Sequence, residues 1–141
     1  MIEVVNRQRV RKVNTTQWRR FGEVALKTIG REHENATIVF VTDETIKKLN
    51  RRFRGKNYAT DVLSFAQEAA SFEVPNQSHL GDVVISVQRA QAQAKENGLS
   101  LTVEVKQLIL HGLLHLCGYD HETDGGEMNR LELRLRRRLG I

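Results

Sequence analysis

The sequence has few of the residues that secreted or membrane proteins depend on. It contains one cysteine, Cys117, in 141 residues, so an internal disulfide is excluded and no disulfide partner is expected. Its apolar runs are shorter than the roughly 18 residues that a membrane helix needs. The N-terminal stretch MIEVVNRQRVRKV lacks the apolar segment of a signal peptide. We therefore expect a chain that works in the reducing cytoplasm, without a membrane partner.

Aromatic residues are also scarce, at 6% of the chain, which leaves little scope for a row of rings that stacks on single-stranded bases. Basic residues exceed acidic ones, with 22 Lys and Arg against 17 Asp and Glu, and the formal net charge is +5. One basic cluster lies in residues 47–56, which contain no acid: Lys47, Lys48, Arg51, Arg52, Arg54 and Lys56. Such a cluster either neutralises phosphates or forms a solvated helix face.

Strand-like and helix-like segments alternate along the chain. β-branched and apolar runs at 2–5, 36–41, 62–66 and 80–86 predict about four strands. Apolar residues at helical spacing predict about five helices. One begins at a cap formed by Thr15 or Thr16, and another, near 102–116, is apolar almost all round and therefore buried. The sequence thus predicts a single compact α+β domain over residues 1–141, with a mixed sheet packed against helices.

Three of the five histidines lie in the segment HGLLHLCGYDH, residues 111–121. His111 and His115 are four residues apart on the buried helix and therefore point to the same side. Gly118 can adopt a left-handed turn, which allows His121 to return to the same point. Three imidazoles and an open position make up a catalytic zinc site. We therefore predict one Zn²⁺ at the C-terminal end of this helix, with other divalent transition metals as alternatives.

The alternative is a set of unrelated core or surface histidines. It is disfavoured because two imidazoles buried without partners would each cost about 1–3 kcal/mol. Cys117 is rotated by about 200° from His115 around the helix, which favours a small buried apolar side chain over a ligand. Asp120, beside His121, is either a proton relay or orienting group for the site, or a turn residue that binds its own backbone.

The histidine spacing matches that of the HExxHxxGxxH zinc proteases, but Gly112 stands where those enzymes have their glutamate. Since that glutamate activates the water, its absence argues against peptide hydrolysis. A zinc-bound water already has a pKa lowered to about 7, so hydrolysis of another bond does not require it. A metal-dependent, protease-like hydrolase therefore remains a disfavoured alternative.

The segment HGLLHLCGYDH closely resembles the motif of the YbeY family of bacterial endoribonucleases and ribosomal-RNA maturation factors. Two further blocks are similar to that family in the same order, LNRRFRGKNYATDVLSF at 49–65 and LGDVVIS at 80–86. The resemblance covers most of the chain from residue 36 onward. It implies a metal-dependent domain that cleaves single-stranded RNA and acts in small-subunit ribosomal-RNA maturation and ribosome quality control.

The resemblance also implies roles for particular residues. It makes His111, His115 and His121 the metal ligands, and it gives the RGK segment a functional arginine, Arg54. A fixed guanidinium at this position can clamp a phosphate and offset the charge that develops during cleavage.

The other residues of the two upstream blocks carry weaker predictions. The basic residues around Arg54 are expected to steer RNA into the site. Asp61 and Ser64, in the TDVLSF segment, are weak site candidates, since a cap and strand role explains them equally well. A non-catalytic, metal-stabilised RNA-binding factor that assists assembly of the ribosomal small subunit remains the alternative to the endoribonuclease.

Overall fold

The computed structural model describes residues 1–67 and 79–141 of the chain. The elements follow in the order β1 (Ile2–Asn6), α1 (Thr15–Ile29), β2 (Asn35–Val41), α2 (Asp43–Arg54), β3 (Val62–Ala66), β4 (His79–Ser86), α3 (Val87–Glu96), α4 (Leu101–Leu116) and α5 (Glu127–Leu139). The predicted α+β class is confirmed, with four strands and five helices in the described ranges. No helix in these ranges has the length and apolarity needed to cross a membrane.

The four strands form one mixed sheet in the order β1-β2-β4-β3. β1 and β4 both pair with β2 in parallel, and β3 lies antiparallel to β4 at the edge of the sheet. β2 and β4 occupy the centre because their β-branched residues suit a surface that is buried on both sides. The site described below lies beside the edge strand β3.

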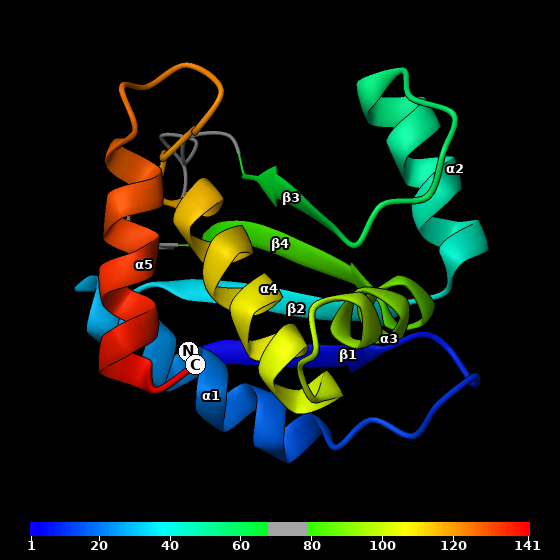
Figure 1. The fold of residues 1–141 in the computed structure, drawn as a ribbon, viewed down its shortest axis with the longest axis horizontal. Helices are drawn as coiled ribbons and strands as arrows, with labels where there is room; N and C mark the ends of the chain where they lie inside the picture. The colour runs from blue at the N-terminus through cyan, green and yellow to red at the C-terminus, as the bar shows by residue number, and fades with distance from the viewer. Residues whose placement is uncertain (68–78) are drawn as a thin grey trace, which may run out of the picture.

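One face of the sheet is covered by α1, α3 and α4 (Figure 1). The core between these layers is apolar and fully buried, and it includes Leu26, Ile38, Phe40, Val83, Ile85, Ile109 and Leu113. α2 covers the other face, where Ile46 packs against Leu63 and Val84. In Figure 1, α2 stands apart from α4 and α5, on the far side of β3.

α4 is enclosed on two sides, which confirms the buried helix that the sequence predicts. One side faces the sheet, and Leu110 and Leu114 on another side pack against Met128 and Leu135 of α5. Both leucines are completely buried, and burial of such a side chain stabilises the fold by about 1.5–3 kcal/mol. The helix that carries two of the histidines is therefore held rigidly in the core.

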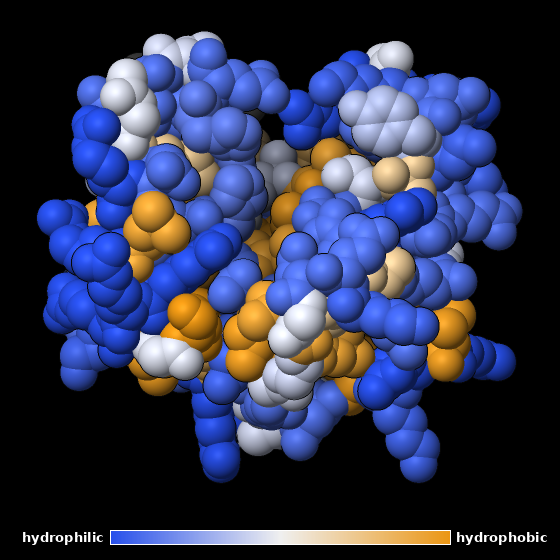
Figure 2. Space-filling view, viewed as in Figure 1, coloured by the Kyte–Doolittle hydropathy of each residue, from blue (hydrophilic) through white to orange (hydrophobic). Residues whose placement is uncertain are grey.

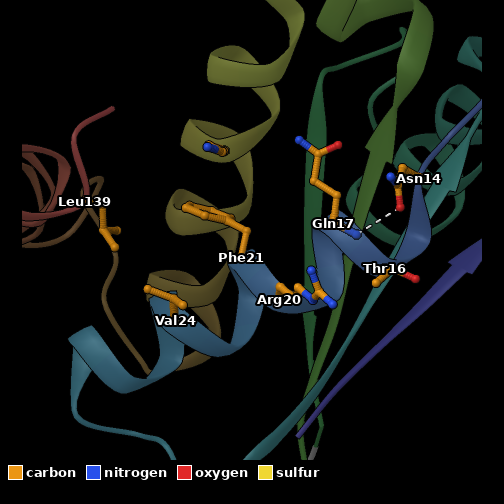
Figure 3. Close-up of a pocket in the computed structure, with 8 residues that line it drawn as sticks. Asn14, Thr16, Gln17, Arg20, Phe21, Val24 and Leu139 are labelled. Carbon is orange, nitrogen blue, oxygen red and sulfur yellow. Dashed lines mark hydrogen bonds between the residues drawn. The ribbon is translucent and has the colours of Figure 1, made fainter.

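The predicted cap of the first helix, Thr15 or Thr16, is wrong by one or two residues. The cap of α1 is Asn14, whose side chain accepts a hydrogen bond from the backbone N–H of Gln17 at 3.1 Å (Figure 3). Thr15 and Thr16 already lie in the helix. Asparagine is among the strongest N-cap residues, and Asn14 has the extended backbone that a cap requires.

α4 packs closely against the sheet at Gly112. A Cβ atom at this position would lie 2.5 Å from Cγ1 of Val83 and 3.2 Å from Oγ of Ser64. The Ser64 hydroxyl also donates a hydrogen bond to the carbonyl oxygen of Gly112 at 3.1 Å. Only glycine therefore allows α4 to lie this close to β3 and β4.

We expect Gly112→Ala to destabilise the protein by about 1–3 kcal/mol, because the added methyl group overlaps Val83 in a core without spare volume. The free energy of unfolding in urea measures the loss. In a Val83→Ala background the same change should be neutral or stabilising, since the clash is gone and alanine favours a helix over glycine. An equal loss in both backgrounds would contradict this account.

Candidate metal centre

The three histidines of the motif meet at the end of α4. One ring nitrogen from each of His111, His115 and His121 lies within 4.8 Å of the others. The ring centroids of His111 and His115 are 4.7 Å apart, and that of His121 lies 5.5 Å from His111 and 5.3 Å from His115. His111 and His115 are half-buried, whereas His121 is exposed. The group is therefore open to solvent on one side.

The turn after α4 brings His121 back toward the helix. Gly118 has a φ of 98°, in the left-handed region that glycine adopts without strain. The backbone N–H of Tyr119 then donates to the carbonyl oxygen of Leu114 at 3.2 Å, which closes the end of the helix. The chain reversal that the sequence predicts at Gly118 is thus present.

Two of the histidines are fixed by partners outside the cluster. Nδ1 of His111 lies 2.5 Å from a carboxylate oxygen of Glu132, and Nδ1 of His115 lies 2.9 Å from the carbonyl oxygen of Tyr119. Both oxygens are acceptors, so each Nδ1 carries the hydrogen and each Nε2 has a free lone pair. The two Nε2 atoms face each other at 3.1 Å.

This arrangement fits a divalent transition-metal ion. Two lone pairs aimed at each other across 3.1 Å repel unless a cation lies between them. The separation is close to the roughly 3.3 Å expected for two imidazole nitrogens on one tetrahedral zinc ion. Three imidazole donors suit zinc, nickel and copper alike, so the donor set fixes the class of metal and not its identity.

The electrostatics of the site favour neutral imidazole. Burial lowers the pKa of His115, and a positive charge on His111 would lower it further, against a smaller opposing effect of the Tyr119 carbonyl. His115 therefore keeps the unprotonated form that binds a metal to lower pH than a free imidazole does. Burial also raises the pKa of the Cys117 thiol, and Cys117 is not a member of the histidine group.

The cluster forms one wall of a cleft with a volume of about 450 Å³. The described residues that line it come from the end of α2, β3, α4 and the following turn: Arg54, Thr60, Asp61, Val62, Ser64, Ala66, His111, His115, Leu116, Gly118, Tyr119, Asp120, His121 and Glu122. Figure 2 shows the hollow between the polar side chains over α2 and those over the turn before α5. The three histidines and Arg54, over fifty residues apart in sequence, thus share one cleft.

Arg54 is the last residue of α2, and its side chain is exposed. Gly55 ends the helix with a φ of 68°, so the chain turns away and leaves Arg54 at the cleft. The remaining basic residues of the cluster lie elsewhere on α2 or just beyond it. Three of them line a separate groove: Lys47, Lys48 and Arg51. Arg52 lies over the Phe53 ring at 5.2 Å, and Lys56 is exposed in the following loop.

The three weaker candidates line the cleft but also have local structural roles. Asp120 accepts the backbone N–H of Glu122 at 3.0 Å, so its side chain stabilises the turn. Asp61 accepts the N–H of Val62 at 2.8 Å, at the start of β3. Ser64 is the residue that donates to Gly112 across the β3–α4 contact.

Sequence reasoning missed Glu132 and its partner Arg136, both on α5. Glu132 is only 7% exposed, and its second oxygen accepts from the guanidinium of Arg136 at 3.0 Å. Burial alone would raise the pKa of Glu132, but the hydrogen bond from His111 and the charges of His111 and Arg136 together lower it. The signal was present: Glu132 follows Met128 by four residues, so a carboxylate lies in the apolar stripe of this helix.

A second depression lies between α1, α4 and α5 (Figure 3). Its lining consists of Asn14, Thr16, Gln17, Arg20, Phe21, Val24, Lys106 and Leu139. These residues include no histidine, cysteine or carboxylate, so the depression offers neither metal ligands nor a general base.

The chain is similar to known proteins over most of its length. A family model described as "Endoribonuclease YbeY" matches residues 3–140. A protein of that name from Aquifex aeolicus is 41% identical over 125 residues, which cover 87% of this chain and 78% of the relative. A second, from Geobacter metallireducens, is 36% identical over 136 residues, which cover 96% and 91%. A solution structure from Thermotoga maritima has the same fold, with a TM-score of 0.60 at 24% identity over 95% of this chain and 85% of that one.

We expect the purified protein to contain about one transition-metal ion per chain, and His111→Ala, His115→Ala or His121→Ala to remove most of it, since two imidazoles hold such an ion weakly. Elemental analysis by mass spectrometry measures the metal content. His33→Ala is the matched control, because the His33 side chain is 95% exposed and lies outside the cluster. Equal metal content in the control and the three variants would contradict the site.

Proposed function

Because this chain belongs to the YbeY endoribonuclease family, we propose that it is a zinc-dependent endoribonuclease that cuts single-stranded RNA in the cleft between α2 and the end of α4. The observation that carries the proposal is that Arg54 and the three-histidine group line the same cleft. A cationic guanidinium opposite a metal site is an arrangement that suits a phosphodiester, which has an anionic centre and a leaving oxygen.

In this proposal His111, His115 and His121 hold the zinc ion through their imidazole nitrogens. When bound, zinc supplies Lewis acidity and makes water acidic enough to serve as a nucleophile near neutral pH. Among the chain's own groups, His111 and His115 are held by Glu132 and Tyr119, so the donors require little rearrangement.

Arg54 binds the phosphate at the scissile bond. Its planar guanidinium offers two parallel N–H donors to two phosphate oxygens, and its fixed charge offsets the negative charge that grows as the bond breaks. The exposed side chain at the end of α2 can reach a phosphate that enters the cleft from solvent. The basic residues outside the cleft act at longer range and steer the RNA chain: Lys47, Lys48, Arg51, Arg52 and Lys56.

Asp61, Ser64 and Asp120 have a supporting role in this proposal. Asp61 and Ser64 shape the β3 wall of the cleft, and Asp120 holds the turn that carries His121. The family resemblance further leads us to propose that the substrate is small-subunit ribosomal RNA. The protein would then act in ribosome maturation and quality control in the cytoplasm.

The two alternatives are not favoured. A protease of the HExxH type needs a glutamate at position 112, and the packing of Gly112 against Val83 leaves no room for any side chain. A non-catalytic assembly factor needs no arginine at the metal site, whereas Arg54 lines the same cleft as the three histidines.

We expect Arg54→Gln to reduce kcat/KM for cleavage of a single-stranded RNA by about 100- to 1,000-fold, the range for loss of one donor to a developing oxyanion. Metal content and the free energy of unfolding should not change, because Arg54 is exposed and is not a member of the histidine group. Arg19→Gln, an exposed position on α1, is the matched control and should retain activity. Full cleavage by the Arg54 variant at normal metal content would contradict the proposed role.

RNA binding should weaken steeply with salt, because Lys and Arg release counterions from phosphates. For single-stranded RNA, a plot of the logarithm of the binding constant against the logarithm of the salt concentration should become shallower by about 0.7 for each cation removed. Replacing Lys47 and Arg51 with Gln should therefore reduce the slope by about 1.4, as measured by fluorescence anisotropy. Both proteins in this comparison, with and without the changes at Lys47 and Arg51, carry Arg54→Gln so that the RNA is cleaved slowly. An unchanged slope would show that this groove does not contact RNA.

A further inference from the structure

The buried carboxylate of Glu132 lies between two hydrogen-bond donors from different directions. One oxygen faces Nδ1 of His111 on α4, and the other faces the guanidinium of Arg136 one turn further along α5. A carboxylate at 7% exposure is costly unless both of its oxygens are satisfied, and here each has one charged or polar partner.

The position of this carboxylate determines what His111 can do. A neutral imidazole has one protonated and one unprotonated nitrogen, and the hydrogen bond at one nitrogen sets the state of the other. An ionised carboxylate only accepts, so Nδ1 of His111 must donate to it. Nε2 then keeps its lone pair on the side that faces His115 and His121.

We propose that Glu132, held in place by Arg136, is a positioning residue that fixes the ring orientation and tautomer of His111 for metal binding. The inference rests on the proposed function, because it concerns the same three-histidine site. Glu132 reaches the site only because Met128 and Leu135, on the same face of α5, are buried against α4. The packing of α5 against α4 thus determines where the carboxylate of Glu132 meets His111.

The chemistry of glutamine makes Glu132→Gln a sharp test. A glutamine has one oxygen, so it can accept from His111 or from Arg136 but not from both. If its oxygen faces Arg136, its NH₂ group faces Nδ1 and favours the wrong tautomer. If its oxygen faces His111, its NH₂ group meets the donors of Arg136. The double variant Glu132→Gln with Arg136→Gln removes this conflict, since the glutamine oxygen is then free for His111.

In zinc-loaded protein, Glu132→Gln should weaken zinc binding by about 10- to 100-fold, as measured by competition with a chelator. The proton resonance of His111 Nδ1–H should move upfield, because it loses a hydrogen bond to a charged acceptor. The double variant should recover part of the affinity. Arg137→Gln, on the exposed side of α5, is the control and should bind zinc as the unmodified chain does.

Two outcomes would overturn the inference: unchanged zinc affinity with an unmoved resonance in Glu132→Gln, or a double variant that binds zinc no better than Glu132→Gln alone. If Glu132→Gln does not fold, the variant Glu132→Leu with Arg136→Leu, which leaves no acceptor for His111 on this face of α5, carries the test, and unchanged zinc affinity in that variant overturns the inference. Failure of the proposed function is distinct, because the unmodified protein would then not bind metal or would not cleave RNA.

Discussion

The contact between Gly112 and Val83 is the constraint on which the rest of the site depends. It brings the backbone of α4 against the sheet at a distance that any Cβ atom would prevent, and Ser64 adds a hydrogen bond across the same contact. Because α4 is fixed there, the preceding and following residues have fixed directions. His111 and His115 therefore emerge at the edge of the core, half-buried, beside the edge strand β3.

The site uses this rigid helix in combination with three less buried segments. The turn at Gly118 supplies His121, α5 supplies the carboxylate behind His111, and the end of α2 supplies Arg54. α2 and α5 are far apart in sequence, and both helices pack onto the core through their own apolar residues. The two histidines on the helix have partners outside the cluster, whereas Arg54 is exposed to solvent.

Periodicity and glycine positions allowed much of this arrangement to be predicted. The i, i+4 spacing of His111 and His115 and the turn at Gly118 are local in sequence, so helix geometry was sufficient for them. The β-branched runs likewise predicted the strands of the sheet to within a residue or two. The start of α1 was missed because Asn14, Thr15 and Thr16 are all good caps, and only the backbone shows which one precedes the helix.

For Glu132 the sequence shows a carboxylate in an apolar stripe, but it does not show the contact with His111. Its role depends on how far α5 is rotated and shifted along α4, which is decided by the packing of leucines and a methionine rather than by any motif. The same is true of the basic cluster on α2. The six cations are close together in sequence, but the helix points them in different directions. Of the six, Arg54 alone lines the cleft.

The same contact at Gly112 also separates this site from that of a zinc protease with equal histidine spacing. A glutamate in that motif needs room beside the metal, and here that space is filled by the sheet. The cleft is instead lined by β3 and by the cationic side chain of Arg54 at the end of α2. A phosphodiester is anionic before and during cleavage, so a guanidinium that lines the cleft suits it better than it suits a neutral peptide. Glycine rather than glutamate at position 112 thus follows from the packing of α4 on the sheet.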